Sequence, residues 1–371
     1  MVALDRWADA VAGWRKVKID AARCLPKISP RSCCDACVAV CPEGAIRFGA
    51  SPTVKDCSAC GLCAASCRAD AITLDNPSDE QLVQRFVAQS RKAPRLSLTC
   101  MAGPTGPEQV GCLGRITPEL LLAAAACGFT EIELVAGPCG ACQYAKGREM
   151  VEAAILATTT ILRNVNHPCG LRLIEAPAWK PTASKPPGAG VQAPVYEERR
   201  AFLLSAFGLL RELIPLAPSR HAQNQPTAPT LSRRREALRW ALAQLQVDNH
   251  RSVPWSETGL RLTGRCLHCG ICQRLCPNGA IKVADGAGLQ LDTQRCHTCG
   301  LCTGVCPVGA LALEAPYSLS DVAGGAPVHL GEVAAYNCDR CGQAVTATGA
   351  GAPLCLPCTI RSPYHQEVIG L

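Results

Sequence analysis

The chain has 371 residues, a formal net charge of +7 and 27 cysteines, most of which fall in tight sets. This length predicts two to four domains, and the grouping of the cysteines favours metal sites over scattered disulfides. No apolar run approaches the roughly 18 residues that a membrane-spanning helix needs, and residues 1–20 are too charged for a signal peptide. We therefore expect a cytoplasmic protein whose cysteines are reduced or bind metal.

Residues 1–80 are predicted to form a domain with two clusters, led by an amphipathic helix over residues 3–20. Residues 57–67 have the spacing C-x2-C-x2-C-x3-C. Three such cysteines wrap a loop around one corner of a [4Fe–4S] cube, and the fourth faces the neighbouring cluster, as in bacterial two-cluster ferredoxins. One predicted ligand group, named the Cys57 set, comprises Cys57, Cys60, Cys63 and Cys41.

The other half of this pattern is irregular, because Arg31 stands where its first cysteine is expected and cannot ligate iron. Cys24, upstream on a proline-containing loop that is long enough to fold back, is the preferred substitute. Cys33 is the alternative, although the adjacent Cys33 and Cys34 struggle to reach different irons. A three-iron cluster is a third possibility. The predicted Cys24 set comprises Cys24, Cys34, Cys37 and Cys67.

Residues 94–176 have the pattern of a small parallel α/β domain, after a solvated linker helix over residues 76–93. Strand-like and helical stretches alternate as βαβαβ, which predicts parallel strands with right-handed crossovers. The expected strands are 96–100, 130–135 and 171–175, and the expected helices are 118–127 and 145–165. Ligands gather at the carboxyl ends of strands in such sheets. Four cysteines lie at those ends or in an adjoining loop, and are named the Cys100 set: Cys100, Cys112, Cys139 and Cys142.

The stretch VGCLGRITPELLLAAAACGFTEIELVAGPCGACQYAKG resembles the small iron–sulfur subunit of methyl-viologen-reducing hydrogenases, a partner of heterodisulfide reductase. The resemblance covers residues 95–165 and implies a [2Fe–2S] centre, ligated by the Cys100 set, that passes electrons onward. Two other interpretations stay open. One is a redox-active dithiol at Cys139 and Cys142, at a helix start whose dipole favours thiolates. The other is a set of buried structural thiols.

Residues 177–254 are rich in proline and alanine and predict a semi-rigid linker with two helices, at 196–213 and 231–247. Ser232 is the expected cap of the second helix, which opens with Arg233, Arg234 and Arg235. Three successive arginines indicate a solvated face, with a surface for an acidic partner as the weaker alternative.

Residues 255–316 contain the four-cysteine pattern twice, as CLHCGICQRLCP and CHTCGLCTGVCP. Two matched halves predict a second bacterial-type ferredoxin domain, because zinc knuckles pair cysteines two at a time. The Cys266 set comprises Cys266, Cys269, Cys272 and Cys306, and the Cys296 set comprises Cys296, Cys299, Cys302 and Cys276. His268 and His297 lie inside these loops and are candidates for hydrogen bonds to sulfur rather than for ligands.

Residues 330–371 contain two C-x2-C pairs, a pattern typical of a zinc ribbon. The predicted ligands of this zinc, named the Cys338 set, are Cys338, Cys341, Cys355 and Cys358. A mononuclear iron site would use the same four ligands but is usually accompanied by more aromatic residues. An unmetallated or cluster-bound state also stays open.

The predicted fold is α+β and multidomain: two ferredoxin-like 2[4Fe–4S] modules, one small parallel α/β domain and one zinc-ribbon-like module. Four cubanes, one further cluster and one zinc bring the charge balance to about −5, so no nucleic-acid partner is expected. The chain offers no evident catalytic residue.

The expected function is electron transfer, as a subunit or docking partner of a larger redox enzyme of the hydrogenase, formate dehydrogenase or heterodisulfide reductase type. The expected partner contains flavin or metal. One alternative is a thiol–disulfide or heterodisulfide reductase-like enzyme, with Cys139 and Cys142 fed by the clusters. Another is an assembly or maturation factor.

Overall fold

The computed structural model describes residues 17–32, 34–49, 52–75, 77–176, 232–247, 259–284, 288–314, 317–324, 327–351 and 354–361. Cys33 and the helix predicted over residues 196–213 lie outside them, as does most of the helix predicted over residues 3–20. The C-terminal end of the helix predicted over residues 3–20 is wrong, since Val17–Ile19 form strand β1. Within the described ranges, no helix is long and apolar enough to cross a membrane.

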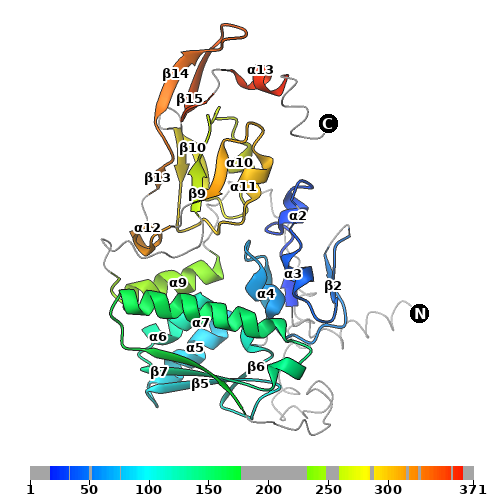
Figure 1. Ribbon diagram of the computed structural model, residues 1–371, viewed down its shortest axis with the longest axis vertical. Helices are drawn as coiled ribbons and strands as arrows, with labels where there is room; N and C mark the ends of the chain where they lie inside the picture. The colour runs from blue at the N-terminus through cyan, green and yellow to red at the C-terminus, as the bar shows by residue number, and fades with distance from the viewer. Residues whose placement is uncertain are drawn as a thin grey trace, which may run out of the picture. The chain divides into compact units, whose positions relative to one another are not determined.

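The middle of the chain is built on a four-stranded parallel sheet with the order β6-β5-β7-β8 (Figure 1). Helix α6 (Pro118–Ala126) connects β6 to β7, and α7 (Lys146–Asn164) connects β7 to β8. The edge strand β6 was not predicted, because three residues are too few for a strand period to show. The strands are β5 (Arg95–Cys100), β6 (Glu108–Val110), β7 (Glu131–Ala136) and β8 (Gly170–Glu175).

The two faces of this sheet have different surroundings. Along β7, Ile132 and Leu134 are fully buried, and the residues between them are only half-buried. The helices lie on one side of the strands in Figure 1, and α6 is buried along most of its length, as an apolar helix should be. The other face carries ion pairs, including Arg95 to Glu131 at 2.8 Å. Because this face carries charged pairs, it can be exposed to solvent, although parallel sheets are usually covered on both faces.

Helix α5 (Asp79–Ser90) belongs to the core of this domain. Ser78 and Gln81 form a capping box at its start, which fixes where the helix begins. Leu82 and Phe86, one turn apart, are fully buried and join the main hydrophobic cluster. Burial of each such side chain contributes about 1.5–3 kcal/mol. The helix predicted over residues 76–93 is confirmed, but its interpretation as a solvated linker is wrong.

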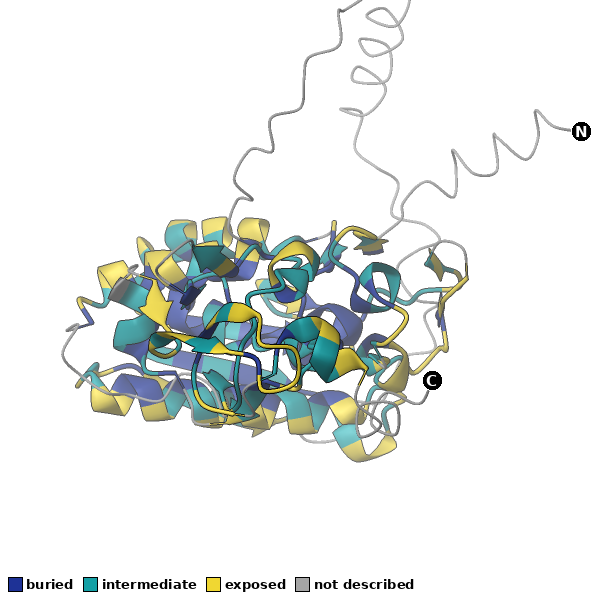
Figure 2. Ribbon diagram, turned by 90° about the horizontal axis from the view of Figure 1, so that it is seen from above, coloured by how far each residue is buried: buried dark blue, intermediate teal, exposed yellow. Residues whose placement is uncertain are grey.

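Helix α9 (Arg233–Gln244) also packs into this core, against α6. Ser232 caps it as predicted, with its side chain accepting from the backbone N–H of Arg235 at 3.3 Å. Leu238 and Ala241 are fully buried, and Figure 2 shows buried residues on the inner sides of the helices and exposed residues outside. The arginines at its start do not form a solvated face: only Arg233 is exposed, and Arg234 and Arg235 are buried.

The first ferredoxin-like region pairs its outermost strands, β1 with β4, in antiparallel fashion. An inner hairpin of two-residue strands, β2 and β3, lies between them in the sequence. Its remaining elements are three short helices that carry or precede cysteines. The bounds are β2 (Ile46–Arg47), β3 (Thr53–Val54), β4 (Ile72–Leu74), α2 (Leu25–Ile28), α3 (Ala36–Ala39) and α4 (Leu62–Ser66).

The second ferredoxin-like region repeats this arrangement. Its outer strands β9 and β12 pair antiparallel, and its inner hairpin of β10 and β11 is extended by β13. The bounds are β9 (Gly259–Leu262), α10 (Ile271–Leu275), β10 (Ile281–Ala284), β11 (Gly288–Leu291), α11 (Leu301–Val305), β12 (Leu311–Glu314), α12 (Leu319–Gly324) and β13 (Val328–His329).

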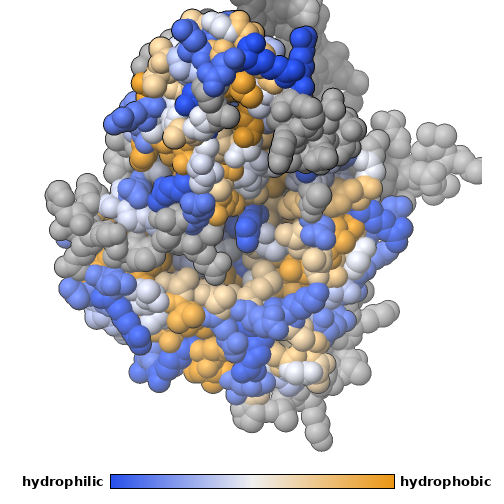
Figure 3. All heavy atoms as spheres, turned by 45° about the horizontal axis from the view of Figure 1, so that its top comes forward, coloured by the Kyte–Doolittle hydropathy of each residue, from blue (hydrophilic) through white to orange (hydrophobic). Residues whose placement is uncertain are grey.

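The C-terminal module is a hairpin of β14 (Val333–Asn337) and β15 (Ala344–Thr348), followed by α13 (Leu356–Ile360). An isolated antiparallel bridge joins Thr348 to Cys266, so the hairpin is held against a ligand loop of the second ferredoxin-like region. Over the face of the molecule in Figure 3, hydrophilic and hydrophobic residues are interspersed.

Candidate metal centres

The four ligand loops of the ferredoxin-like regions end in the same turn. In each, a backbone N–H four residues after the last cysteine donates to its Sγ at 3.3 Å: Ala45 to Cys41, Ala71 to Cys67, Ala280 to Cys276 and Ala310 to Cys306. The residue before each donor has a positive φ: Gly44, Asp70, Gly279 and Gly309. Glycine adopts this conformation readily, so Asp70 is the unusual member. The four loops therefore share one backbone geometry around their last cysteine.

Two of the predicted ligand sets surround open spaces. All four cysteines of the Cys57 set line a space of about 320 Å³, and all four of the Cys296 set line one of about 370 Å³. At the start of the following helices, Gly61 (φ 87°) and Gly300 (φ 80°) take the left-handed conformation. This conformation turns the loop sharply around the space, as a compact multi-metal group requires.

The protonation of these cysteines is sensitive to what fills the spaces. Burial, with a smaller contribution from the neighbouring thiols, raises the pKa of Cys63 to about 12. Burial, with the nearby Cys276 and Cys296, likewise raises the pKa of Cys299 to about 12. Without a cation, buried thiols so close together remain protonated at neutral pH. Soft thiolate ligands facing one another fit an iron–sulfur cluster, whose binding would displace these protons.

The Cys24 set is also brought together. Burial raises the pKa of Cys24, and the charges of Cys67 and Cys34 lie near enough to raise it too. The pKa of Cys37 is raised to about 12, mainly by burial and also by the charges of its three partners in the set. Cys24 directly precedes α2, with Pro26 in its first turn, so this short helix replaces the open loop that was predicted. Cys33 lies outside the described residues.

We predict that Cys24→Ala converts the cluster of the Cys24 set to a three-iron form or removes it, because one corner of the cube loses its thiolate. Cys33→Ala is the matched control and should leave four irons in this set. Iron analysis and EPR of the anaerobically purified full chain would distinguish the two variants. Loss of the cluster in Cys33→Ala alone would assign the ligand to Cys33.

The Cys266 set completes the second ferredoxin-like region. Burial raises the pKa of Cys266, and Cys306 and Cys269 raise it further, so these thiols lie close together. The two loop histidines do not contact sulfur as suggested. His268 Nε2 lies 2.6 Å from Thr348 Oγ1, and His297 Nε2 lies 2.8 Å from Ser232 Oγ.

The Cys100 set lines a space of about 410 Å³ at the carboxyl ends of β5 and β7. The Sγ of Cys100 accepts a hydrogen bond from the backbone N–H of Gly137 at 3.3 Å. On the opposite side, Gly147 of α7 leaves room for Cys112: a Cβ added there would lie 2.3 Å from Cys112 Sγ. Sequence reasoning missed Gly147, because nothing local distinguishes it from any other helical glycine.

The surroundings of Cys139 and Cys142 differ from the prediction of a helix start. Cys139–Ala141 form a 3-10 turn, and α7 begins only at Lys146, so the helix dipole does not act on these two cysteines directly. Burial raises the pKa of Cys139, and the charges of Cys100 and Cys142 raise it further. A raised pKa is the opposite of what activates a nucleophilic thiol. The site is better suited to a cation-containing cluster than to a reactive dithiol.

The Cys338 set converges at the C-terminal hairpin. One sulfur from each of its four cysteines lies within 4.8 Å of the others. The backbone N–H of Cys355 and other nearby amides lower the pKa of Cys338 to about 6, so this group is a thiolate at neutral pH. Four sulfur ligands from two knuckles, closing a hairpin, fit tetrahedral zinc.

Residues 265–310 match the family described as a 4Fe-4S dicluster domain. The matched range contains all the cysteines of the Cys266 and Cys296 sets. Comparisons with curated proteins and with solved structures gave no match. The cysteines elsewhere in the described part of the chain are free thiols, four of which converge as a possible metal site, so they are also available as metal ligands. The chain is an iron–sulfur protein of mixed helix and sheet, with a ferredoxin-type domain that binds [4Fe–4S] clusters.

Proposed function

We propose that this protein carries electrons along one line of five iron–sulfur centres, with structural zinc in the Cys338 set. The centres are four [4Fe–4S] clusters and one [2Fe–2S] cluster, held by the ligand sets predicted above. The observation that carries the proposal is that each set lies beside the next. The order is the Cys100, Cys57, Cys24, Cys296 and Cys266 sets.

The first two steps of this order join the α/β domain to the first ferredoxin-like region. The charge of Cys60 raises the pKa of Cys112, so the two thiols lie near each other. A Cβ added at Gly111 would lie only 2.9 Å from the Cα of Cys60, so the two ligand loops touch. Within the first region, Cys37 acts on Cys63 in the same way.

The third step crosses between the ferredoxin-like regions, and the fourth lies within the second region. One small hydrophobic cluster contains Cys24 and Cys67 from the first region and Leu301 and Cys299 from the second. Within the second region, the charge of Cys272 raises the pKa of Cys302. When bound, the clusters accept and donate single electrons, and these residues hold them apart from water and next to one another.

The chain is proposed to serve as a subunit or docking partner of a larger redox enzyme that contains flavin or metal, of the hydrogenase, formate dehydrogenase or heterodisulfide reductase type. No acid–base pair or nucleophile was identified in the sequence, and the best dithiol candidate has a raised pKa at Cys139. Both points favour electron transfer over a reductase reaction at Cys139 and Cys142. The Cys100 set, at one end of the line, is the expected exchange point with the partner.

The metal content tests this proposal directly. We predict about 18 irons and one zinc for each chain purified without oxygen, since four cubanes and one two-iron centre are expected. Iron, sulfide and zinc analysis would measure this load, and EPR would count the cluster types. A preparation that reconstitutes to only about eight irons would contradict the four-cubane assignment, leaving the 4Fe-4S dicluster domain alone.

A further inference from the structure

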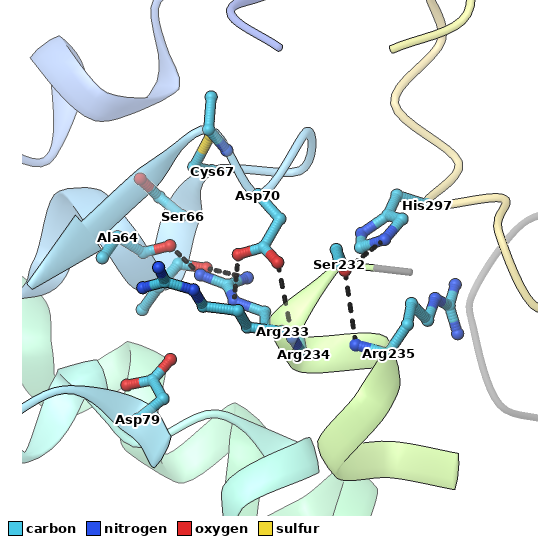
Figure 4. A network of polar contacts seen from close by, with 12 residues as sticks. Ala64, Ser66, Cys67, Asp70, Asp79, Ser232, Arg233, Arg234, Arg235 and His297 are labelled. Atoms are coloured by element: carbon cyan, nitrogen blue, oxygen red, sulfur yellow. Dashed lines mark hydrogen bonds and ion pairs between the residues drawn. The ribbon is translucent and has the colours of Figure 1, made fainter. Parts of the chain in front are cut away.

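Helix α9 places two buried arginines between two ligand sets. Arg234 and Arg235 are 9% and 5% exposed, whereas the side chain of Arg233 is 49% exposed. Figure 4 shows Arg234 directed toward Ala64 and Asp70, and Arg235 leaving the helix on the other side. We propose that Arg234, Arg235 and Asp70 set the reduction potentials of the clusters in the Cys24 and Cys296 sets. This inference rests on the proposed function, because it requires clusters in both sets.

Arg234 holds the end of the helix that precedes a ligand. Its guanidinium donates to the carbonyl oxygen of Ala64 and to that of Ala65 at 3.2 Å. These carbonyls belong to the last turn of α4, and Cys67 follows as its C-cap. A cation at the carboxyl end of a helix complements the partial negative charge there. Arg234 thus brings a full positive charge next to the backbone that carries Cys67.

Asp70 is the counter-charge, and its position is unusual. Its carboxylate lies 3.4 Å from Nε of Arg234 and accepts from the backbone N–H of Arg234, also at 3.4 Å. Asp70 has a φ of 53° in the turn where the three other ligand loops have glycine. Glycine adopts this conformation without steric cost, so an aspartate that is only 7% exposed in its place points to a role for the charge.

Arg235 reaches the other ferredoxin-like region. Its guanidinium donates to the carbonyl oxygen of Cys296, a predicted ligand. The helix cap is tied to the same loop, because Ser232 Oγ lies 2.8 Å from His297 Nε2. The start of α9 therefore contacts the ligand loops of two clusters at once, one through Arg234 and one through Arg235.

Buried charges act strongly on reduction. A cluster that gains an electron gains a negative charge, so a nearby cation stabilises the reduced form and a nearby carboxylate stabilises the oxidised form. The effect is large where water is excluded, because the interior screens charges less than bulk water does. Glu119 and Asp79 also act on Arg234, but Asp79 is already paired with Arg115 at 2.8 Å. Glu119 therefore opposes the effect of Arg234 from a distance, whereas Asp70 is the carboxylate in direct contact with it.

The test is a potentiometric titration of the anaerobically purified full chain, followed by EPR. At a fixed potential near the midpoint, Arg234→Gln should lower the ratio of reduced to oxidised cluster in the Cys24 set by at least about tenfold. For a one-electron couple this corresponds to about 59 mV. Arg235→Gln should do the same for the Cys296 set. Asp70→Asn should shift the Cys24 set in the opposite direction, and asparagine tolerates its positive φ.

Two variants separate charge from structure. Arg233→Gln, on the same helix turn but exposed, should leave every potential unchanged. Arg234→Lys keeps the charge and loses the forked hydrogen bonds, so it should hold the potential near that of the unmodified protein. If Arg234→Gln loses the cluster altogether, the reduction potentials of Arg234→Lys and Asp70→Asn test the inference instead.

The inference is overturned if Arg234→Gln keeps its full iron content and its potentials do not change. Where Arg234→Gln loses its cluster, unchanged potentials in Asp70→Asn with full iron content overturn it instead. Either result leaves the proposed function intact. A shift of the same sign in Arg234→Gln and Asp70→Asn would also overturn it, because two opposite charges cannot act alike. If the unmodified protein holds no cluster in the Cys24 and Cys296 sets, the proposed function fails instead, and iron analysis detects that case first.

Discussion

Gly147→Ala will empty the Cys100 set, whereas Gly140→Ala will leave it loaded. A Cβ at Gly147 would lie 2.3 Å from Cys112 Sγ and 3.2 Å from a methyl carbon of Leu62. A Cβ at Gly140, in the turn that follows Cys139, meets nothing within 4 Å. The two substitutions add the same methyl group at the same candidate centre, so only the contact with the ligand differs.

The surroundings of Gly147 leave the added methyl group little room to escape. Helix α7 is anchored by the buried Val151 and Ala154 on its next turns, so the cysteine must move instead of the helix. Alanine in place of glycine would by itself stabilise a helix interior by about 0.5–1 kcal/mol. A lost centre in Gly147→Ala would therefore come from the contact with Cys112. We expect about 16 irons instead of about 18, measured by iron analysis together with EPR. Equal iron in the two variants would show that Cys112 does not ligate from this position.

Cys112→Ser will remove the [2Fe–2S] signal completely and leave the four cubanes in place. A serine hydroxyl stays protonated and is a harder ligand than a thiolate, so it does not replace the sulfur. Because the Cys57 set has its own four ligands, its cluster should survive the change. EPR of the reduced full chain, with total iron, measures both outcomes. The matched control is Cys127→Ser, at the end of α6 and outside every ligand set.

The same variant also tests the alternative of a reactive dithiol. If Cys139 and Cys142 act as a dithiol, Cys112→Ser should change little, and both cysteines should alkylate readily once reduced. Fast alkylation of Cys139 in a protein without a [2Fe–2S] signal, with Cys112→Ser changing nothing, would contradict the cluster assignment. Slow alkylation at every cysteine of the set, in a protein without a [2Fe–2S] signal, would leave buried structural thiols as the remaining interpretation.

The ligand loops could be predicted from the sequence because their chemistry is local. Cys266 to Cys276 span one turn of loop and one short helix, so spacing alone determines which sulfurs face the same space. The same holds for the Cys338 set, whose four sulfurs converge as the two knuckles indicated. Three of the four strands of the α/β domain were also evident; β7, for example, alternates buried and half-buried residues along its whole length.

Contacts between distant segments could not be predicted in this way. Arg234 and Asp70 are 164 positions apart, and nothing near either residue reveals the other. Three successive arginines have the sequence pattern of a solvated face whether or not the folded chain places carbonyl oxygens within hydrogen-bonding distance of them. Helix α5 was misjudged for a related reason: its charged residues are conspicuous in the sequence, but Leu82 and Phe86 decide where it packs.

The position of α9 in the chain has a consequence for how the protein is made. The α/β core includes Leu238 and Ala241, which follow the last strand of the sheet by more than sixty positions. When residues 17–176 have emerged from the ribosome, every strand of the sheet has therefore been synthesised, but the helix that covers α6 has not. Until α9 emerges, α6 keeps apolar surface uncovered, and the end of α4 lacks its arginine. The α/β core and the polar contacts at the end of α4 are therefore completed only after residues 232–247 have been synthesised.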